Sequence, residues 1–168
     1  VRPKVGATII DDRMERALDL FSFNTLDISR RTFNDIQGFR NLIEVGSVDA
    51  IFDHLRAADI AEMRNINAQL RTAGSIAEAS EADFSFHLRL VSVLRNRAVL
   101  DVYRIMKPVI IRIMERAKEL RNFTVDTYEQ HASVVDALEA RDRIRYQYAL
   151  KSHLQLGLTA FEDDSELP

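Results

Sequence analysis

Three histidines and one aspartate of this chain occur in a pattern that can hold a metal ion. Asp83 and His87 are four residues apart, and in a helix this spacing puts both side chains on one face, one turn apart. His131 and His153 follow in two later segments that also have helical periodicity. One carboxylate and three imidazoles suit zinc, nickel, manganese, iron or cobalt. The sequence therefore predicts a transition-metal site, on the condition that the fold brings these segments together.

Apolar residues surround these three histidines, which indicates that the imidazoles point into the core. The flanking apolar residues are Phe84, Phe86, Leu90, Val134, Val135, Leu150, Leu154 and Leu156. A single histidine among apolar neighbours is more often a packed core residue than a ligand, but an inward aspartate needs a cation or donors to offset its desolvation. The fourth histidine, His54, follows Asp53 on the expected exposed side of its helix. We therefore leave His54 out of the site.

The elements that must position these residues are predicted to be helices. Only five glycines and three prolines occur in 168 residues, and from Arg31 onward apolar residues recur every three or four positions. Gly46 and Gly74 are expected to end helices, and Ser47 and Ser75 to cap the next ones. The predicted helices are 31–45, 47–56, 59–72, 76–94, 98–120, 124–140 and 143–161. The expected fold is all-α, an antiparallel bundle of six or seven helices.

The predicted helix 98–120 is the most apolar of the set. Such a pattern predicts a helix at the centre of the bundle, or one packed against both the core and a partner chain. Pro108 lies inside this helix and should kink it, because proline removes a backbone donor and clashes with the preceding turn.

Composition and charge exclude several classes of protein. The chain is 46% hydrophobic and 29% charged, an ordinary balance for a globular domain, and its net charge of −3 gives no basic footprint for nucleic acid. Cysteine is absent, which excludes disulfides, thiolate chemistry and cysteine-rich zinc sites. No apolar run approaches the roughly 20 residues that cross a bilayer. We expect a cytoplasmic protein without a membrane partner.

Two histidine-centred segments resemble the FCD domain of FadR-like regulators in the GntR family of transcription regulators. Asp83-Phe-Ser-Phe-His87 resembles the Asp-x-x-Phe-His signature of this domain. Glu129-Gln-His131-Ala-Ser-Val-Val-Asp-Ala-Leu-Glu-Ala-Arg-Asp142 is similar to its Glu-His-x-x-Ile-x-x-Ala-Leu-x-x-Arg-Asp segment, with one additional residue after the glutamate. His153 then stands where the domain has the metal ligand of its last helix. The resemblance covers about residues 31 to 160.

Shorter matches lie on either side of these segments. Arg40-Asn-Leu-Ile-Glu44 is similar to the Arg-x-x-Leu-Glu opening helix, and Leu94-Arg-Asn96 keeps only the last residue of the family's Ser-Gly-Asn turn. The first ten residues look like the last strand of a winged helix-turn-helix domain. The resemblance implies a remnant of this wing at 1–10, a linker at 11–30, an FCD domain at 31–162 and an acidic tail at 163–168.

What the resemblance implies is a ligand sensor. Family members with the full set hold a metal ion with it, here through Asp83, His87, His131 and His153. The implied ion is zinc or nickel, with manganese or iron as alternatives. A small carboxylate effector would complete the coordination, and Arg40 would make a second contact to it. Arg40 can equally form an intrahelical pair with Glu44, four residues later.

The resemblance also implies the partners, and two other functions stay open beside the sensor. DNA would bind through a winged helix-turn-helix domain preceding this one, and the protein would form a homodimer. A metal-dependent helical-bundle enzyme is the first alternative, although the Glu-x-x-His pairs of di-iron bundles are absent. The second alternative is a structural module without a ligand. We expect the sensor rather than an enzyme.

Overall fold

The described part of the chain consists of helices joined by short loops. The computed structural model describes residues 30–120 and 124–162, which contain helices and short loops but no strand. The elements are α2 (Arg30–Arg40), the π-helical segment η1 (Asn41–Val45), α3 (Val48–His54), α4 (Ala57–Thr72), α5 (Ile76–Ser92), α6 (Arg97–Ile105), α7 (Lys107–Leu120), α8 (Thr124–Glu139) and α9 (Arg143–Glu162). The predictions for 1–10, 11–29 and 163–168 lie outside the described residues, and Arg30 begins α2.

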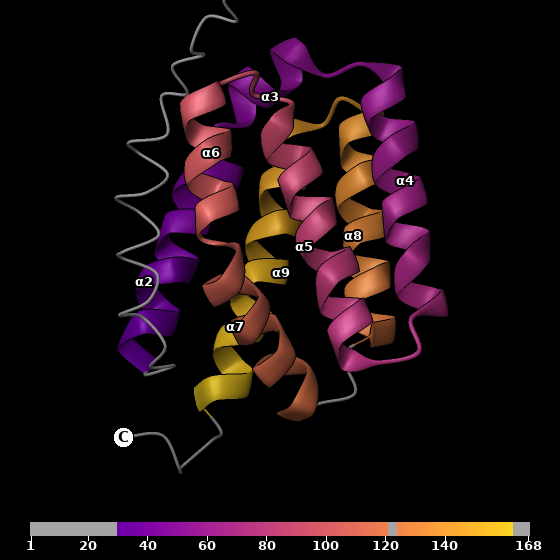
Figure 1. The fold of residues 1–168 in the computed structure, drawn as a ribbon. Coiled ribbons are helices and arrows are strands. Elements are labelled where there is room, and N and C mark those ends of the chain that lie inside the picture. Colours follow the sequence, from indigo (N-terminus) through magenta and orange to yellow (C-terminus); the bar gives the residue numbers. More distant parts are fainter. Residues whose placement is uncertain (1–29, 121–123, 163–168) are drawn as a thin grey trace, which may run out of the picture.

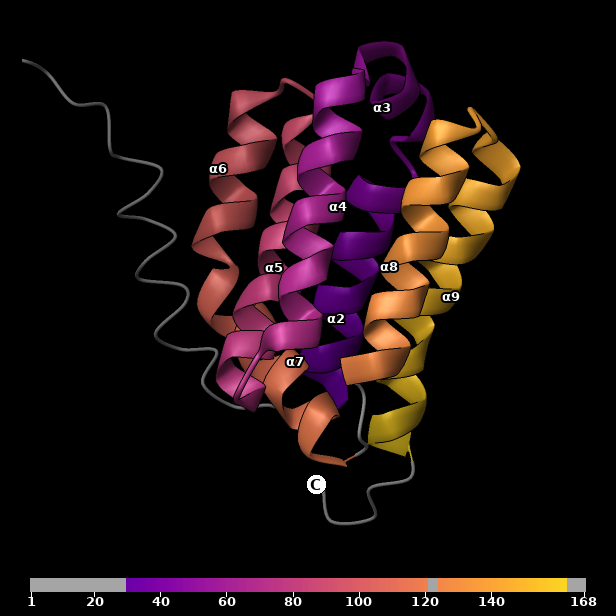
Figure 2. The same cartoon turned by 90° about the vertical axis from the view of Figure 1, so that its right-hand side faces the viewer.

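The long helices stand side by side in a bundle, with the short α3 at one end (Figures 1 and 2). Helix α5 is central: nine of its 17 residues are buried, and it contacts α4, α6, α7 and η1. Helix α9 contacts α8, α2, α3, α7 and η1. This arrangement confirms the predicted all-α bundle and brings α5 together with α8 and α9, which come much later in the sequence, around one interior.

Capping side chains set several helix starts. Ser75 accepts a hydrogen bond from the backbone N–H of Glu78 at 3.1 Å, as its predicted capping role requires. Helix α4 begins two residues before the predicted start at Asp59, because Asp59 occupies its first turn and accepts from the backbone N–H of Arg56 at 2.8 Å.

The predicted helix 98–120 is two helices, α6 and α7, which separate at Met106. Pro108 stands in the first turn of α7, where a missing backbone N–H leaves no hydrogen bond unmade. Helix α5 rather than this segment holds the central place, while α6 and α7 pack against it, so the alternative of a helix packed against both the core and a partner chain stays a prediction. Helix α6 buries only Tyr103 completely and leaves its other apolar side chains partly exposed.

The end of the first predicted helix has π geometry. The backbone N–H of Gly46 bonds to the carbonyl of Asn41, five residues back, at 3.0 Å. This wider turn buries Glu44 and Val45 while Leu42 stays 73% exposed. A Cβ on Gly46 would lie 2.5 Å from the carbonyl oxygen of Leu42, so this turn requires glycine.

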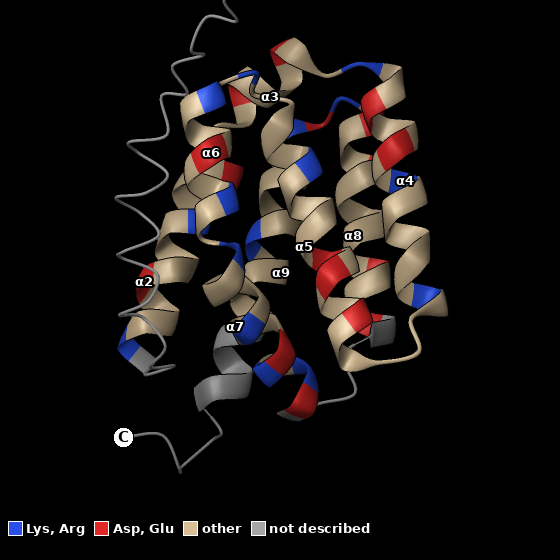
Figure 3. Ribbon diagram, viewed as in Figure 1, with Lys and Arg blue, Asp and Glu red and all other residues tan. Residues whose placement is uncertain are grey.

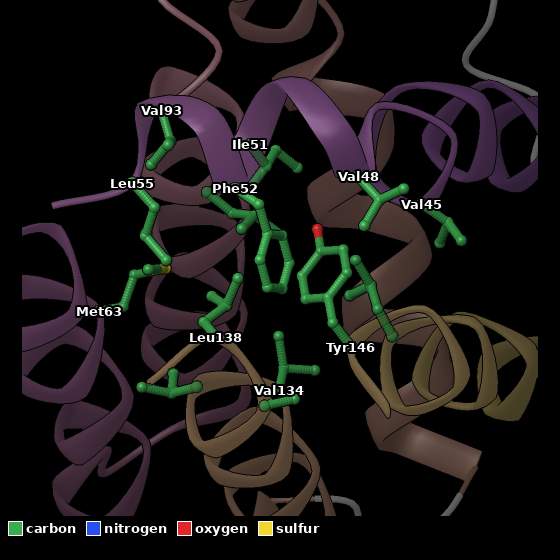
Figure 4. Packing of buried hydrophobic residues seen from close by; sticks show 14 of the residues in the cluster. Val45, Val48, Ile51, Phe52, Leu55, Met63, Val93, Val134, Leu138 and Tyr146 are labelled. Atoms are coloured by element: carbon green, nitrogen blue, oxygen red, sulfur yellow. The ribbon is translucent and has the colours of Figure 1, made fainter. Parts of the chain in front are cut away.

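The largest apolar cluster joins α3, α4, α5, α8 and α9 (Figure 4). The rings of Phe52 and Tyr146 meet edge to face, with centroids 5.5 Å apart and planes at 76°. The hydroxyl of Tyr146 donates to the backbone carbonyl of Glu44 at 2.7 Å, which ties α9 to η1. A second cluster, around Phe84, Tyr103 and Ile110, packs α6 and α7 against α5. The polar interior described below is therefore enclosed by apolar packing.

The surface carries charges of both signs. On the face shown in Figure 3, Lys and Arg are interspersed with Asp and Glu. No helix in the described ranges is long and apolar enough to span a membrane.

Candidate metal centre

The fold brings the four predicted ligands to one point inside the bundle. We call Asp83, His87, His131 and His153 the Asp–His cluster; their ligand atoms all lie within 4.8 Å of one another. The Nε2 atom of His153 is 3.0 Å from that of His87 and 3.2 Å from that of His131. The Oδ1 atom of Asp83 is 3.3 Å from His87 Nε2 and 3.4 Å from His131 Nε2. Helices α5, α8 and α9 thus converge here, which is the condition on which the predicted metal site depended.

The outer nitrogen of each imidazole contacts a side-chain oxygen from a neighbouring element. These Nδ1 contacts are His87 with Glu44 Oε2 at 2.5 Å, His131 with Asn67 Oδ1 at 3.2 Å and His153 with Gln130 Oε1 at 2.7 Å. The Asn67 amide is oriented by its Nδ2, which donates to the carbonyl of Tyr128 at 3.0 Å. Because an oxygen acceptor fixes the proton on Nδ1, each Nε2 presents its lone pair to the centre.

Without a cation this centre is electrostatically unfavourable. Three nitrogen lone pairs face a carboxylate oxygen, and Asp83 Oδ1 is buried with no hydrogen-bond partner among the described residues. Metal–nitrogen bonds of about 2.0–2.1 Å place two ligands of one ion roughly 3.0–3.4 Å apart, depending on the coordination angle. Four of the six ligand pairs, at 3.0, 3.2, 3.3 and 3.4 Å, match this range, and all six pairs lie within 4.8 Å. The four residues therefore fit a transition-metal ion.

Burial keeps the imidazoles of His131 and His153 in the neutral form that binds metal. Desolvation lowers the pKa of His131 from 6.5 to about 4, although Asp83 acts in the opposite direction. Burial also lowers the pKa of His153 well below its ordinary value, helped by the neighbouring His131 and His87. Neutral imidazoles at pH 7 have a free lone pair for a metal ion.

The two oxygens of Asp83 have different surroundings. Its Oδ2 lies 2.6 Å from Nζ of Lys118, which comes from α7 and is as buried as the carboxylate. Burial alone would raise the pKa of Asp83, but the charge of Lys118 and the neighbouring His131 and His87 together hold that pKa well below the ordinary value. Asp83 is thus ionised, with Oδ1 directed to the histidines.

Glu44 connects the cluster to the first helix. Its carboxylate contacts His87, accepts from Arg40 Nε at 2.9 Å and accepts from the hydroxyl of Tyr103 at 2.7 Å. Burial opposes its ionisation, yet the charge of Arg40 and the bond from His87 lower its pKa to about 2. The negative charge of Glu44 in turn raises the pKa of Arg40, against the effect of burial.

Arg40 forms one of the two interactions that the sequence left open, and it lies where the other would be made. It forms the intrahelical pair with Glu44, and it also lines a cavity beside the cluster. Its Nη1 donates to Gln37 at 3.2 Å, while Nη2 is buried without a hydrogen-bond partner in the described part of the chain. The Nη2 group of Arg40 can therefore donate a hydrogen bond to a further acceptor.

This cavity offers about 50 Å³ to the centres of water-sized molecules. Its polar lining includes two of the four cluster residues and two buried cations: Asp83, His153, Arg40, Lys118, Gln37, Thr127 and Gln130. Its apolar lining is Ile113, Met114, Ala117 and Leu154. The arrangement suits a short molecule with anionic groups and a small carbon skeleton.

Sequence reasoning missed the residues that support the cluster. Glu44 stands in the quoted segment 40–44, and Gln130 precedes His131, but neither position has a spacing that indicates contact with a histidine. Asn67 and Lys118 come from other helices. The one sequence signal for Lys118 was its position near the end of the apolar segment 98–120. His54 lies outside the cluster, as expected.

A family model described as the FCD domain matches residues 35–156, a span that contains the whole Asp–His cluster, Arg40 and Lys118. The search of curated proteins finds no match for the chain.

Proposed function

Because the chain belongs to the FCD domain family, the C-terminal domain of FadR-like GntR regulators, we propose that it senses a small organic acid at a buried metal ion. The observation that carries this proposal is the convergence of three inward Nε2 atoms on a buried Asp83 oxygen without a hydrogen-bond partner in the described residues. The proposal places the chain in the metal-bearing branch of the family, with Asp83, His87, His131 and His153 as ligands.

The ion in this proposal is zinc or nickel, with manganese or iron as alternatives, since imidazole and carboxylate ligands suit all four. When bound, it supplies Lewis acidity and coordination positions open to a carboxylate oxygen. The surrounding residues would orient this centre: Glu44, Asn67 and Gln130 hold the three imidazoles at Nδ1. Such outer partners usually matter for metal affinity by about 10–100-fold.

Arg40 is the proposed second contact for the acid. Its free Nη2 and its place in the cavity wall support a charge-assisted hydrogen bond to a carboxylate. The apolar wall of Ile113, Met114 and Leu154 would take the carbon skeleton. These contacts would select acids over neutral molecules of the same size.

Arg40 also gives the bound acid a route to the first helix. Arg40 ends α2, and its partner Glu44 lies in η1 and contacts His87. An acid that draws Arg40 away from Glu44 would bind one arrangement of α2 better than another, which is the requirement for a ligand to shift a conformational equilibrium. In FadR-like regulators DNA is bound by an N-terminal domain, so we propose that this shift changes operator affinity in a cytoplasmic homodimer.

Elemental analysis of the purified chain beside two variants tests the metal. We expect about one transition-metal ion per chain in the wild type and loss of that ion in both Asp83→Ala and His131→Ala. His54→Ala, whose histidine lies outside the cluster, is the control and should keep the metal. A wild type that takes up no zinc or nickel, or a His131→Ala variant that keeps its ion, would contradict the assignment.

Thermal shift measurements with a set of organic acids test the sensor. We expect at least one acid to raise the melting temperature of the metal-loaded chain, and Arg40→Met to reduce this effect. Turnover of a stabilising acid by the metal-loaded chain, followed by NMR, would instead favour the enzyme.

A further inference from the structure

We propose that the acid sensed at this site is a dianion, a short dicarboxylate, and that Lys118 binds its second carboxylate. The inference rests on the proposed function and specifies its ligand class. The observation that carries it is that Lys118 is buried at the wall of the cavity. Once a metal ion is bound, Asp83 no longer needs this lysine to balance its charge.

The charges of the described residues around the cavity cancel before any ion is added. Asp83 and Glu44 are negative, Arg40 and Lys118 are positive, and all four are buried. The cluster histidines are neutral when they bind a metal. A divalent ion therefore leaves two positive charges in a site of low dielectric, where uncompensated charge is strongly unfavourable. A dianion restores neutrality, whereas a monoanion leaves one charge without compensation.

Lys118 is placed to interact with the second charge. Its side chain is only 4% exposed, its Nζ contacts Asp83 Oδ2 at 2.6 Å, and the residue lines the cavity. An ammonium group has three donors, of which Asp83 takes one. An ion at Oδ1 would already neutralise Asp83, so a lysine that served only this purpose would become redundant. Because lysine is rarely buried without an anionic partner, Lys118 would then need another anion.

The cavity also limits the distance between the two carboxylates. Its free space of about 50 Å³ touches Asp83, His153, Arg40 and Lys118, so one carboxylate near the cluster and another at Lys118 need only a short carbon chain between them. The apolar side chains of Met114 and Ala117, on the same helix as Lys118, would cover that chain. Malonate and succinate are suitable probes.

Calorimetry on the zinc-loaded 168-residue chain tests the proposal. Each dicarboxylate is compared with its monoamide, malonamate or succinamate, which has nearly the same shape and one negative charge fewer. We expect the better dicarboxylate to bind at least about tenfold more tightly than its monoamide, the typical effect of one charge-assisted hydrogen bond. Lys118→Met should reduce this ratio to near one while the zinc content is unchanged.

Two further variants distinguish a specific role of Lys118 from a general effect. Lys107→Met removes a lysine from the same helix that pairs with Glu81 at the surface, and it should keep the preference. Lys118→Gln is a second neutral variant, so the test stands if Lys118→Met does not fold. Equal binding of dicarboxylate and monoamide by the wild type, or a preference that survives in Lys118→Gln, would overturn the inference. Monocarboxylates that bind best would overturn it too and leave the sensor intact, whereas failure of every acid would count against the proposed function itself.

Discussion

Each histidine of the Asp–His cluster has two differently used ring nitrogens. Nδ1 contacts an oxygen of Glu44, Asn67 or Gln130, and Nε2 faces the centre. The four inner residues were predictable, because the spacing of Asp83 and His87 and the resemblance of two segments both pointed to them. The outer oxygens were not, since Glu44 and Asn67 reach the cluster from helices that pack beside it only in the folded chain.

The burial of the histidines predicts how the metal-free protein responds to pH. His131 has a pKa of about 4 when folded and 6.5 as its ordinary value, so the unfolded chain takes up its proton first as the pH falls. Stability from this group is therefore complete above pH 6.5 and is lost between pH 6.5 and 4. The expected loss is about 3 kcal/mol for His131, and the lowered pKa of His153 adds to it in the same direction.

Urea unfolding of the chelator-treated protein at pH 7 and pH 4.5 measures this loss. The lowered pKa of Glu44 contributes mainly below its ordinary value of 4.5, so most of the difference between the two measurements comes from the histidines. His131→Asn should have a smaller pH dependence than the wild type. A free energy of unfolding that is equal at both pH values would contradict the prediction.

At the scale of elements, the π turn of η1 decides where Glu44 points. The apolar periodicity correctly predicted a helix that ends at Gly46, but periodicity does not distinguish a π turn from an α turn within one or two residues. The selection comes from long-range contacts instead: Tyr146 holds the carbonyl of Glu44, and Tyr103 and His87 hold its carboxylate. The break at Met106 was missed in the same way, because a proline such as Pro108 in a helical segment is compatible with either a kink or the start of a new helix.

Two glycines offer a matched test of this turn. Gly46→Ala would place a Cβ against the carbonyl oxygen of Leu42, so the turn must shift, with an expected loss of about 1–3 kcal/mol in unfolding free energy. Displacement of Glu44 should also weaken zinc binding by about tenfold, measured by competition with a chromophoric chelator. Gly38→Ala is the control: its Cβ meets nothing within 4 Å on the exposed side of α2, and it should stabilise the chain by up to about 1 kcal/mol. Equal effects of the two substitutions would show that the turn is not constrained.

At the scale of the whole molecule, one site connects most of the bundle. The four cluster residues come from α5, α8 and α9, and their outer partners add η1 and α4. The helical class and seven helical segments could be predicted from periodicity. The central place of α5 could not, because apolar content is higher in the segment that forms α6 and α7, and only packing shows which helix is enclosed.

Metal removal should therefore weaken the entire fold. An ion that binds only the folded chain stabilises it by about 3 kcal/mol when its free concentration is roughly one hundred times the dissociation constant. We expect a chelator to lower the melting temperature in scanning calorimetry and added zinc to restore it. Asp83→Ala, which lacks one ligand, should melt at the same temperature with and without the chelator. A wild type that is insensitive to chelator would contradict this prediction.

The partial exposure of His153 has a consequence for the order of events in time. Of the cluster, His87 and His131 are fully buried, Asp83 nearly so, and His153 is the member that keeps some exposure, beside a cavity that it helps to line. If ion and acid both pass through this cavity, the ion must arrive first and leave last. A bound acid would then slow the escape of the ion, and the molecule would keep its metal longest while its signal is present.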